Sequence, residues 1–129
     1  MTGNRFVVQE HTTPQGVHWD LMLETGDVLM TFRLPEPPEN ALHHALRAER
    51  IFDHAPRFLT YEGPVQKGTG QVRIIDRGTY RTLTEQEDAL TLDLSGHTLR
   101  GRFTLTRTEG SFWELTWAAP DQSPRTDPE

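Results

Sequence analysis

The stretch FVVQEHTTPQGVHWDLMLE, residues 6–24, decides the fold of this chain. Apolar and polar side chains alternate on both sides of a short Thr-Thr-Pro-Gln-Gly segment, and strands that present one chemical face read in this way. Pro14 and Gly16 are residue types that favour a loop between two strands. The stretch therefore predicts a β-hairpin.

Pairing arithmetic places four polar side chains on one face of this hairpin. If His11 and His18 close the loop as an antiparallel pair, then Gln9 lies opposite Asp20, because paired positions in such a ladder have a constant sum. These four side chains then share one face of the sheet. The other face points into the core and carries Trp19, Leu21 and Leu23.

A third strand is expected at residues 28–34, after a tight turn that contains Gly26. Continuing the pairing with Glu24 opposite Asp27 places Arg33 opposite His18. Arg33 then reaches the face that carries the histidines. A one-residue bulge in this strand would reverse the orientation of Arg33.

Length and composition describe a single globular domain. The 129 residues are enough for one domain, which we expect at residues 1–119. At residues 120–129, Pro, Asp, Ser and Gln replace apolar residues, and we expect a disordered acidic tail. No apolar run approaches the roughly 20 residues needed to cross a bilayer, so we expect a cytoplasmic protein without membrane contact.

The absence of cysteine and the net charge of −6 limit the chemistry. Without cysteine there is no thiolate nucleophile, and any metal must be held by His and carboxylate side chains. The negative charge argues against sequence-independent wrapping of nucleic acid, which needs many Lys and Arg side chains. It leaves room for a local basic site.

The remainder of the chain predicts a mostly β domain. A short helix is expected from Glu39 or Asn40, with His43 and His44 on its surface, followed by a loop at residues 51–56 that carries His54. Further strands are expected at residues 57–62, 71–76, 79–83, 90–94, 99–105 and 112–118, with a turn at residues 66–70. So many closely spaced strands favour a compact antiparallel β-barrel with one or two short flanking helices.

The polar face of the hairpin has the composition of a metal site. Two imidazoles and one carboxylate, from His11, His18 and Asp20, suit a divalent transition ion and leave positions open for water and substrate. Gln9 is placed to orient these ligands by hydrogen bonding. The residues alone leave open a second interpretation, in which both histidines are ordinary hydrogen-bonded residues at the mouth of the barrel.

Six motifs, in order along the chain, resemble a known family. They are FVVQEH at residues 6–11, HWDLMLE at 18–24, DH at 53–54, YEGP at 61–64, DRGTY at 76–80 and LRGRFTL at 99–105. Together they are similar to the 3'-phosphoesterase domain that is attached to bacterial ATP-dependent DNA ligase D and is also found alone. The resemblance covers about residues 6–117. It implies a β-barrel flanked by helices and a manganese-dependent trimming of 3' ends, in which a 3'-terminal ribonucleoside is removed and the remaining 3'-phosphate is hydrolysed.

The resemblance also implies roles for individual residues. It places the metal ligands at His11, His18 and Asp20, with Mn²⁺ as the expected ion and Zn²⁺ or Co²⁺ as alternatives. A second essential histidine falls on His54, which would contact the phosphate or donate a proton to the leaving 3'-oxygen. Gln9 and Asp53 match positions near the metal and are expected to orient other groups.

The expected partners follow from the same resemblance. They are nucleic-acid 3' ends of the primer-template kind, with a DNA ligase or polymerase acting in trans. The protein is expected to act as a monomer.

Two positions depart from the family pattern. Met22 stands where the ligase-linked enzymes carry an arginine, and Phe58 stands where they carry a tyrosine; both groups would be expected to hold phosphate. A thioether cannot replace the bidentate grip of a guanidinium, and such a loss commonly costs about a hundredfold in rate. Our hypothesis is that Arg33 supplies the positive charge that Met22 does not.

Three functions therefore remain open from the sequence. The chain is a metal-dependent phosphoesterase acting on nucleic-acid 3' ends, or a catalytically weakened module that binds DNA ends or a repair partner, or a phosphohydrolase of small molecules that uses the same barrel.

Overall fold

The computed structural model describes residues 4–65 and 70–118. Nine strands and two short 3₁₀ helices follow one another in this part of the chain. In order they are β1 (Arg5–Thr13), β2 (Gly16–Thr25), β3 (Val28–Leu34), η1 (Pro38–Leu42), β4 (Leu46–His54), η2 (Pro56–Leu59), β5 (Gly63–Val65), β6 (Gly70–Gln86), β7 (Ala89–Gly96), β8 (Arg100–Glu109) and β9 (Phe112–Ala118).

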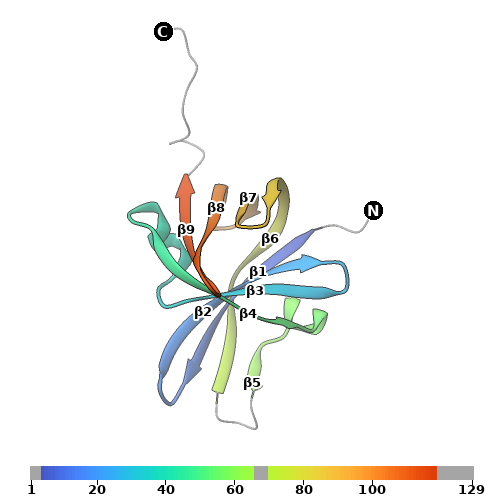
Figure 1. Ribbon diagram of the computed structural model, residues 1–129. Helices are drawn as coiled ribbons and strands as arrows, with labels where there is room; N and C mark the ends of the chain where they lie inside the picture. Colours follow the sequence, from blue (N-terminus) through green and yellow to red (C-terminus); the bar gives the residue numbers. More distant parts are fainter. Residues whose placement is uncertain (1–3, 66–69, 119–129) are drawn as a thin grey trace, which may run out of the picture.

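All the described strands belong to one antiparallel sheet that curls into a ring (Figure 1). The strand order is β1-β2-β3-β4-β9-β8-β7-β6-β5, and an additional pairing of β1 with β6 closes the ring. The short β5 pairs with the first residues of β6. The expectation of a mostly β, barrel-like domain with short flanking helices is confirmed.

The β1–β2 hairpin has the predicted register. His11 pairs with His18, and Gln9 pairs with Asp20. The loop is shorter than expected, because the strands continue to Thr13 and Gly16 and leave only two residues between them. The Thr13 hydroxyl holds this turn: it accepts a hydrogen bond from Gln15 N at 3.1 Å and donates one to Gly16 O at 3.2 Å.

The predicted register between β2 and β3 was wrong by two residues. Arg33 pairs with Asp20 and not with His18. The reason is the turn, in which Thr25 pairs with Val28 around Gly26, whose φ of 63° only glycine adopts readily. A shift of two residues preserves the face on which each side chain lies, so Arg33 remains on the side of the histidines.

The predicted helix was also largely wrong. Only η1 (Pro38–Leu42) is helical, and the chain re-enters the sheet at Leu46. Leu46 and Ala48 are buried and pair with Leu115 and Trp113 of β9. Burial in the sheet therefore overrides the helix propensity of the nearby alanines. His43 and His44 are exposed, as expected.

Three other predicted segments differ from the structure. His54 is the last residue of β4 and does not lie in a loop. The strand expected at residues 57–62 is absent: η2 ends at Leu59, residues 60–62 are irregular, and the short β5 begins only at Gly63. The strands expected at residues 71–76 and 79–83 form one strand, β6. The turn expected at 66–70 falls mainly on 66–69, and these residues, like the tail at 120–129, lie outside the described residues.

The apolar interior of the ring is the main core. It is built by strands from all around the sheet, with Phe6, Phe32 and Phe103 among its fully buried side chains. A second, smaller cluster lies on the opposite face of β1, β2 and β3. It consists of Val7, Met22, Leu29 and Leu59, with Phe58 and Ile74 packed against it. No helix within residues 4–65 and 70–118 is long and apolar enough to cross a membrane.

One buried carboxylate organises the turn between β7 and β8. Asp76 is 5% exposed, and its two oxygens accept hydrogen bonds from four backbone N–H groups. Three of these donors are the consecutive residues His97, Thr98 and Leu99, at 2.8, 3.2 and 2.8 Å. A buried N–H group without an acceptor is costly, so Asp76 substitutes for the missing ladder partners of this turn.

Replacing Asp76 with alanine is expected to lower the free energy of unfolding by about 2–4 kcal/mol, because one buried and three part-buried N–H groups lose their acceptor. Urea denaturation measures the change. Asp88→Ala is the matched control, since Asp88 is exposed and pairs only with Arg107, and it should change stability little. Equal stability of the two variants would contradict this account.

Candidate metal and phosphate site

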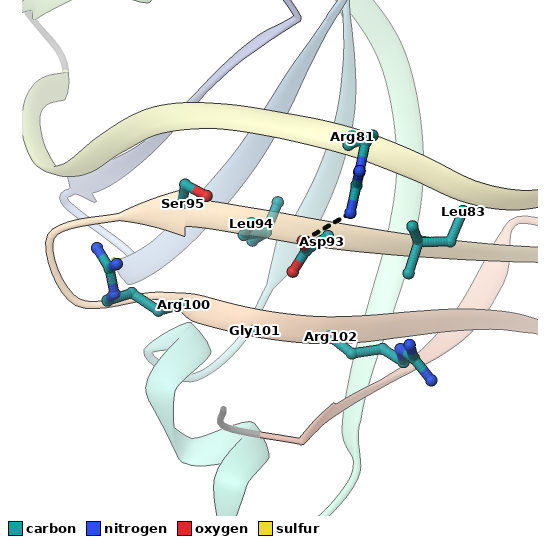
Figure 2. Close-up of a pocket in the computed structure, with 8 residues that line it drawn as sticks. All are labelled: Arg81, Leu83, Asp93, Leu94, Ser95, Arg100, Gly101 and Arg102. Carbon is teal, nitrogen blue, oxygen red and sulfur yellow. Dashed lines mark hydrogen bonds and ion pairs between the residues drawn. The ribbon is translucent and has the colours of Figure 1, made fainter. Parts of the chain in front are cut away.

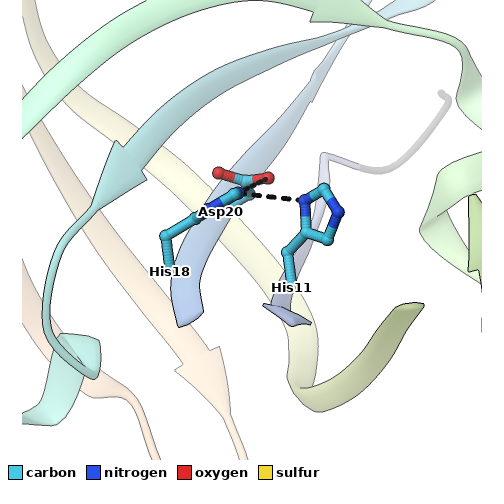
Figure 3. Close-up of side chains that lie close together, drawn as sticks. All are labelled: His11, His18 and Asp20. Atoms are coloured by element: carbon cyan, nitrogen blue, oxygen red, sulfur yellow. Dashed lines mark hydrogen bonds and ion pairs between the residues drawn. The ribbon is translucent and has the colours of Figure 1, made fainter. Parts of the chain in front are cut away.

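Three potential metal ligands converge on one face of the β1–β2 hairpin. His11 Nδ1 lies 3.0 Å from His18 Nε2, and His18 Nε2 lies 3.5 Å from Asp20 Oδ2. Figure 3 shows the three side chains pointing toward one another from the two strands. His11 and Asp20 are buried, with 5% and 2% of their surface exposed, and His18 is half-buried. The hairpin register places all three, as the sequence predicted.

The spacing of these atoms suits a divalent ion. Two ligands that each lie about 2.1 Å from an ion are about 3.0 Å apart at a right angle and about 3.4 Å apart at the tetrahedral angle. The observed separations of 3.0 and 3.5 Å fall close to these values. All three ligand atoms lie within 4.8 Å of one another. Two imidazoles and one carboxylate leave further positions around an ion for water and substrate.

Electrostatics at His11 favours the same interpretation. Burial, followed by the neighbouring His18, lowers the pKa of His11 below its usual value, so the ring is neutral at neutral pH. His11 Nε2 is buried and has no hydrogen-bond partner among the described residues. The other ring nitrogen of His11, Nδ1, faces His18 Nε2 at 3.0 Å. The lone pairs of two nitrogen atoms at this distance repel each other unless a proton or a cation lies between them. The residues present therefore fit a bound metal.

Asp20 is held ionised by its neighbours. Burial acts to raise the pKa of its carboxyl, but the hydrogen bond and charge of His18 and the guanidinium of Arg33 outweigh burial and lower it. Arg33 Nε donates to Asp20 Oδ1 at 3.2 Å. Arg33 thus points toward the cluster of potential ligands, as the alternation of side chains along the strand predicted. The terminal nitrogens of its guanidinium form no hydrogen bond within the described residues.

His54 joins the site from the end of β4. Its Nδ1 lies 3.0 Å from Thr31 Oγ1 and 3.1 Å from Phe52 O. Thr31 Oγ1 donates its own hydrogen to Leu29 O at 3.0 Å, so both neighbours of Nδ1 accept a hydrogen bond. Neutral His54 therefore carries its proton on Nδ1 and keeps a free lone pair on Nε2. Burial lowers the pKa of His54, although the charge of Asp20 opposes this.

A bulge in β4 decides that His54, and not Asp53, faces the site. Thr31 pairs with Ile51, but Leu29 pairs with His54, so β4 has one residue more than β3 between these pairs. Such an extra residue reverses the alternation beyond it. Asp53 is exposed, and its Oδ1 lies 3.1 Å from Arg50 Nη2. The structure does not bring Asp53 together with the other predicted site residues.

His11, Asp20, Arg33 and His54 line one pocket of about 420 Å³. His18 lines a different hollow, of about 320 Å³, which shares Arg33 with this pocket. The residues around it are Gln9, His11, Asp20, Arg33, Phe52, His54, Arg57, Phe58, Tyr61, Pro64, Val65 and Val72. A third hollow of about 350 Å³ lies over β6, β7 and β8 (Figure 2). It contains Arg81, Arg100 and Arg102, but Arg81 pairs with Asp93, and no histidine lines it. Because it contains two of the potential ligands and His54, the first pocket is the candidate functional site.

Gln9 has structural contacts that the sequence did not reveal. Its amide nitrogen donates to Phe58 O at 3.0 Å and to Tyr61 O at 3.1 Å. Gln9 thus ties the wall formed by η2 and the residues after it to β1. Its predicted role of orienting the metal ligands stays a prediction.

The two residues that depart from the family pattern have different environments. Met22 is 1% exposed and packs in the small apolar cluster with Val7, Leu29 and Leu59. It does not line the pocket. Phe58 does line the pocket, and its ring stands nearly perpendicular to that of His54, with 5.7 Å between the ring centroids.

Sequence reasoning missed several residues in and around the pocket. Thr31 holds His54, and Phe52, Arg57 and Tyr61 line the opening. The Arg57 guanidinium lies 4.5 Å from the centre of the Phe58 ring. One of these residues could have been found from the sequence. Arg57 follows His54 by only three residues and comes directly after Pro56, so a position close to His54 could have been expected.

Comparison with known proteins identifies relatives. Residues 9–107 match the sequence profile of the DNA ligase D 3'-phosphoesterase domain. The multifunctional non-homologous end joining DNA repair protein LigD of Mycobacterium tuberculosis is 36% identical over 121 residues, which cover 86% of this chain. LigD of Mycolicibacterium smegmatis is 33% identical and LigD of Pseudomonas aeruginosa is 30% identical, covering 87% and 81% of this chain. The matched region is only 15%, 17% and 13% of these three relatives.

Saturating Mn²⁺ is expected to raise the thermal unfolding midpoint, because a ligand that binds only the folded state stabilises it by about 2.7 kcal/mol at a hundredfold excess over Kd. His18→Ala should abolish this rise. His44→Ala is the control, since His44 is exposed and contacts only Glu36 through its ring. A metal-dependent rise that persists in His18→Ala would contradict the ligand assignment.

Proposed function

The chain belongs to the DNA ligase D 3'-phosphoesterase domain family, and from this membership we propose that it is a metal-dependent phosphoesterase that trims nucleic-acid 3' ends in DNA repair. One observation carries the proposal. Three potential metal ligands lie together on the β1–β2 hairpin, and two of them, His11 and Asp20, share one pocket of about 420 Å³ with the guanidinium of Arg33 and with His54. These are the groups that hydrolysis of a phosphate ester requires.

The metal would be held by His11, His18 and Asp20. The nitrogen and oxygen donors suit several first-row ions, and the family resemblance favours Mn²⁺ over Zn²⁺ or Co²⁺. When bound, a divalent ion polarises a phosphate oxygen and lowers the pKa of water.

Arg33 is the residue best placed to bind the phosphate. Its Nε is held by Asp20 at 3.2 Å, which fixes the plane of the guanidinium. The terminal nitrogens remain for phosphate oxygens, to which guanidinium groups bind strongly. This arrangement supports the hypothesis that Arg33 supplies the charge that Met22 lacks.

His54 would act through Nε2. Its Nδ1 is committed to Thr31 and Phe52, so Nε2 is the atom that meets substrate. A phosphate dianion beside this ring would favour the protonated form, opposing the effect of burial. The imidazolium would then contact a phosphate oxygen, and it would donate its proton to the leaving 3'-oxygen as a water oxygen bonds to phosphorus and the ester P–O bond breaks.

The proposed substrates are 3'-phosphate ends and ends that carry a 3'-terminal ribonucleoside. The names of the relatives describe proteins of non-homologous end joining, and we propose that this chain prepares ends for a DNA ligase or polymerase acting in trans.

A second candidate is a module that binds DNA ends with little turnover. The presence of Met22 where the resemblance implies an arginine favours it, because the site then lacks one phosphate-binding group.

His54→Ala is expected to lower kcat for Mn²⁺-dependent phosphate release from a 3'-phosphorylated primer-template by about a hundredfold or more. The adjacent Asp53→Ala should remain within about twofold of the wild type, because Asp53 lies on the surface beside Arg50. Phosphate release is measured by a colorimetric assay. A large loss in Asp53→Ala and none in His54→Ala would reverse the assignment.

Met22→Arg distinguishes the two candidates. If Arg33 already supplies the phosphate contact, the variant should gain no turnover and should be less stable, because it buries a charge among apolar side chains. Arg33→Ala should then lose about a hundredfold in kcat/KM. A gain of tenfold or more in Met22→Arg would favour the weakened module. Circular dichroism of both variants checks that the fold is retained.

A further inference from the structure

Phe52 is the most exposed of the large apolar side chains in the described part of the chain, with 72% of its surface accessible. A single exposed apolar residue needs no functional explanation by itself. Its position does suggest one, because Phe52 lines the pocket that also contains His11, Asp20 and His54.

The Phe52 ring is stacked on His54. The two ring centroids are 4.8 Å apart, and the ring planes differ by only 12°. His54 therefore covers one face of the phenyl ring, and the high exposure of Phe52 leaves the other face open to solvent. His54 is itself fixed through Nδ1 by Thr31 and Phe52 O. The pocket thus presents a flat, pre-positioned aromatic surface directly beside the group assigned to the phosphate.

We propose that the open face of Phe52 is the stacking platform for the terminal nucleobase of the 3' end. This inference rests on the proposed function, since it requires the 3'-phosphate to lie at His54 and Arg33. The sugar that carries this phosphate then lies at the pocket mouth, and its base is within reach of the phenyl ring. All nucleobases have a π face, so such a platform is indifferent to sequence, as an enzyme that acts on varied ends requires.

The platform makes a quantitative prediction about affinity. Stacking of one base on an aromatic side chain corresponds to about fivefold to a hundredfold in binding. The alternative is that Phe52 only positions His54 through the stack, in which case its loss affects every substrate to the same extent.

The experiment compares two ligands that differ only in the terminal base. One is a 3'-phosphorylated oligonucleotide, and the other is the same oligonucleotide with an abasic 3'-terminal nucleotide. Dissociation constants are measured by fluorescence anisotropy with Mn²⁺ present, and KM is measured where turnover allows. Phe52→Ala should weaken binding of the first ligand at least fivefold and leave the second unchanged, whereas Phe52→Tyr should behave as the wild type.

Leu83→Ala is the matched control, because Leu83 is also exposed but lies on β6 and lines the hollow over β6, β7 and β8. It should change neither dissociation constant. An equal loss for both ligands in Phe52→Ala, or no loss at all, would overturn the platform while leaving the proposed function intact. If the wild type does not distinguish a 3'-phosphate from a 3'-hydroxyl end, the proposed function fails, and the platform fails with it.

Discussion

The antiparallel ladder between β1 and β2 is the constraint on which the site depends. It pairs His11 with His18 and Gln9 with Asp20. Alternate side chains of both strands must fill the interior of the ring, so the residues between them are committed to the opposite face. The ladder thereby brings the side chains of Gln9, His11, His18 and Asp20 together. Each of these polar groups would cost free energy if it were buried without a partner. Burial then keeps His11 neutral, and the partners of Asp20 keep it charged.

The face that carries the site has two chemically distinct halves. Toward one end of the hairpin, Met22 packs with Val7, Leu29 and Leu59 in a dry cluster. Toward the other end, His11 and Asp20 line the pocket. Thr31 lies opposite Met22 and also supports His54. The apolar half therefore gives rigid support to the polar half, which is how a preorganised site avoids reorganisation when substrate binds.

The sequence predicted those parts of the site that depend only on which face of the sheet a side chain occupies, since side chains alternate between the two faces along a strand. The face of Arg33 was predicted correctly although its pairing partner was not, because a shift of two residues leaves the face unchanged. The alternation is interrupted in β4, where one extra residue turns His54 inward and Asp53 outward. The pattern of residues gives no sign of such a bulge. The residue pattern also did not predict that residues 46–49 form a strand and not a helix, because their pairing with β9 decides this.

The closure of the ring by β1 and β6 has a consequence for how the protein folds. Arg5 pairs with Thr79, and Thr12 pairs with Gln71, so this ladder joins distant parts of the chain. His11 and His18, by contrast, meet across a two-residue turn. Local contacts form quickly, and contacts between distant residues form slowly because a long loop must first be closed. The potential metal ligands are therefore able to meet early in folding, whereas the side of the pocket that contains Val72 is completed only when β6 has paired with β1.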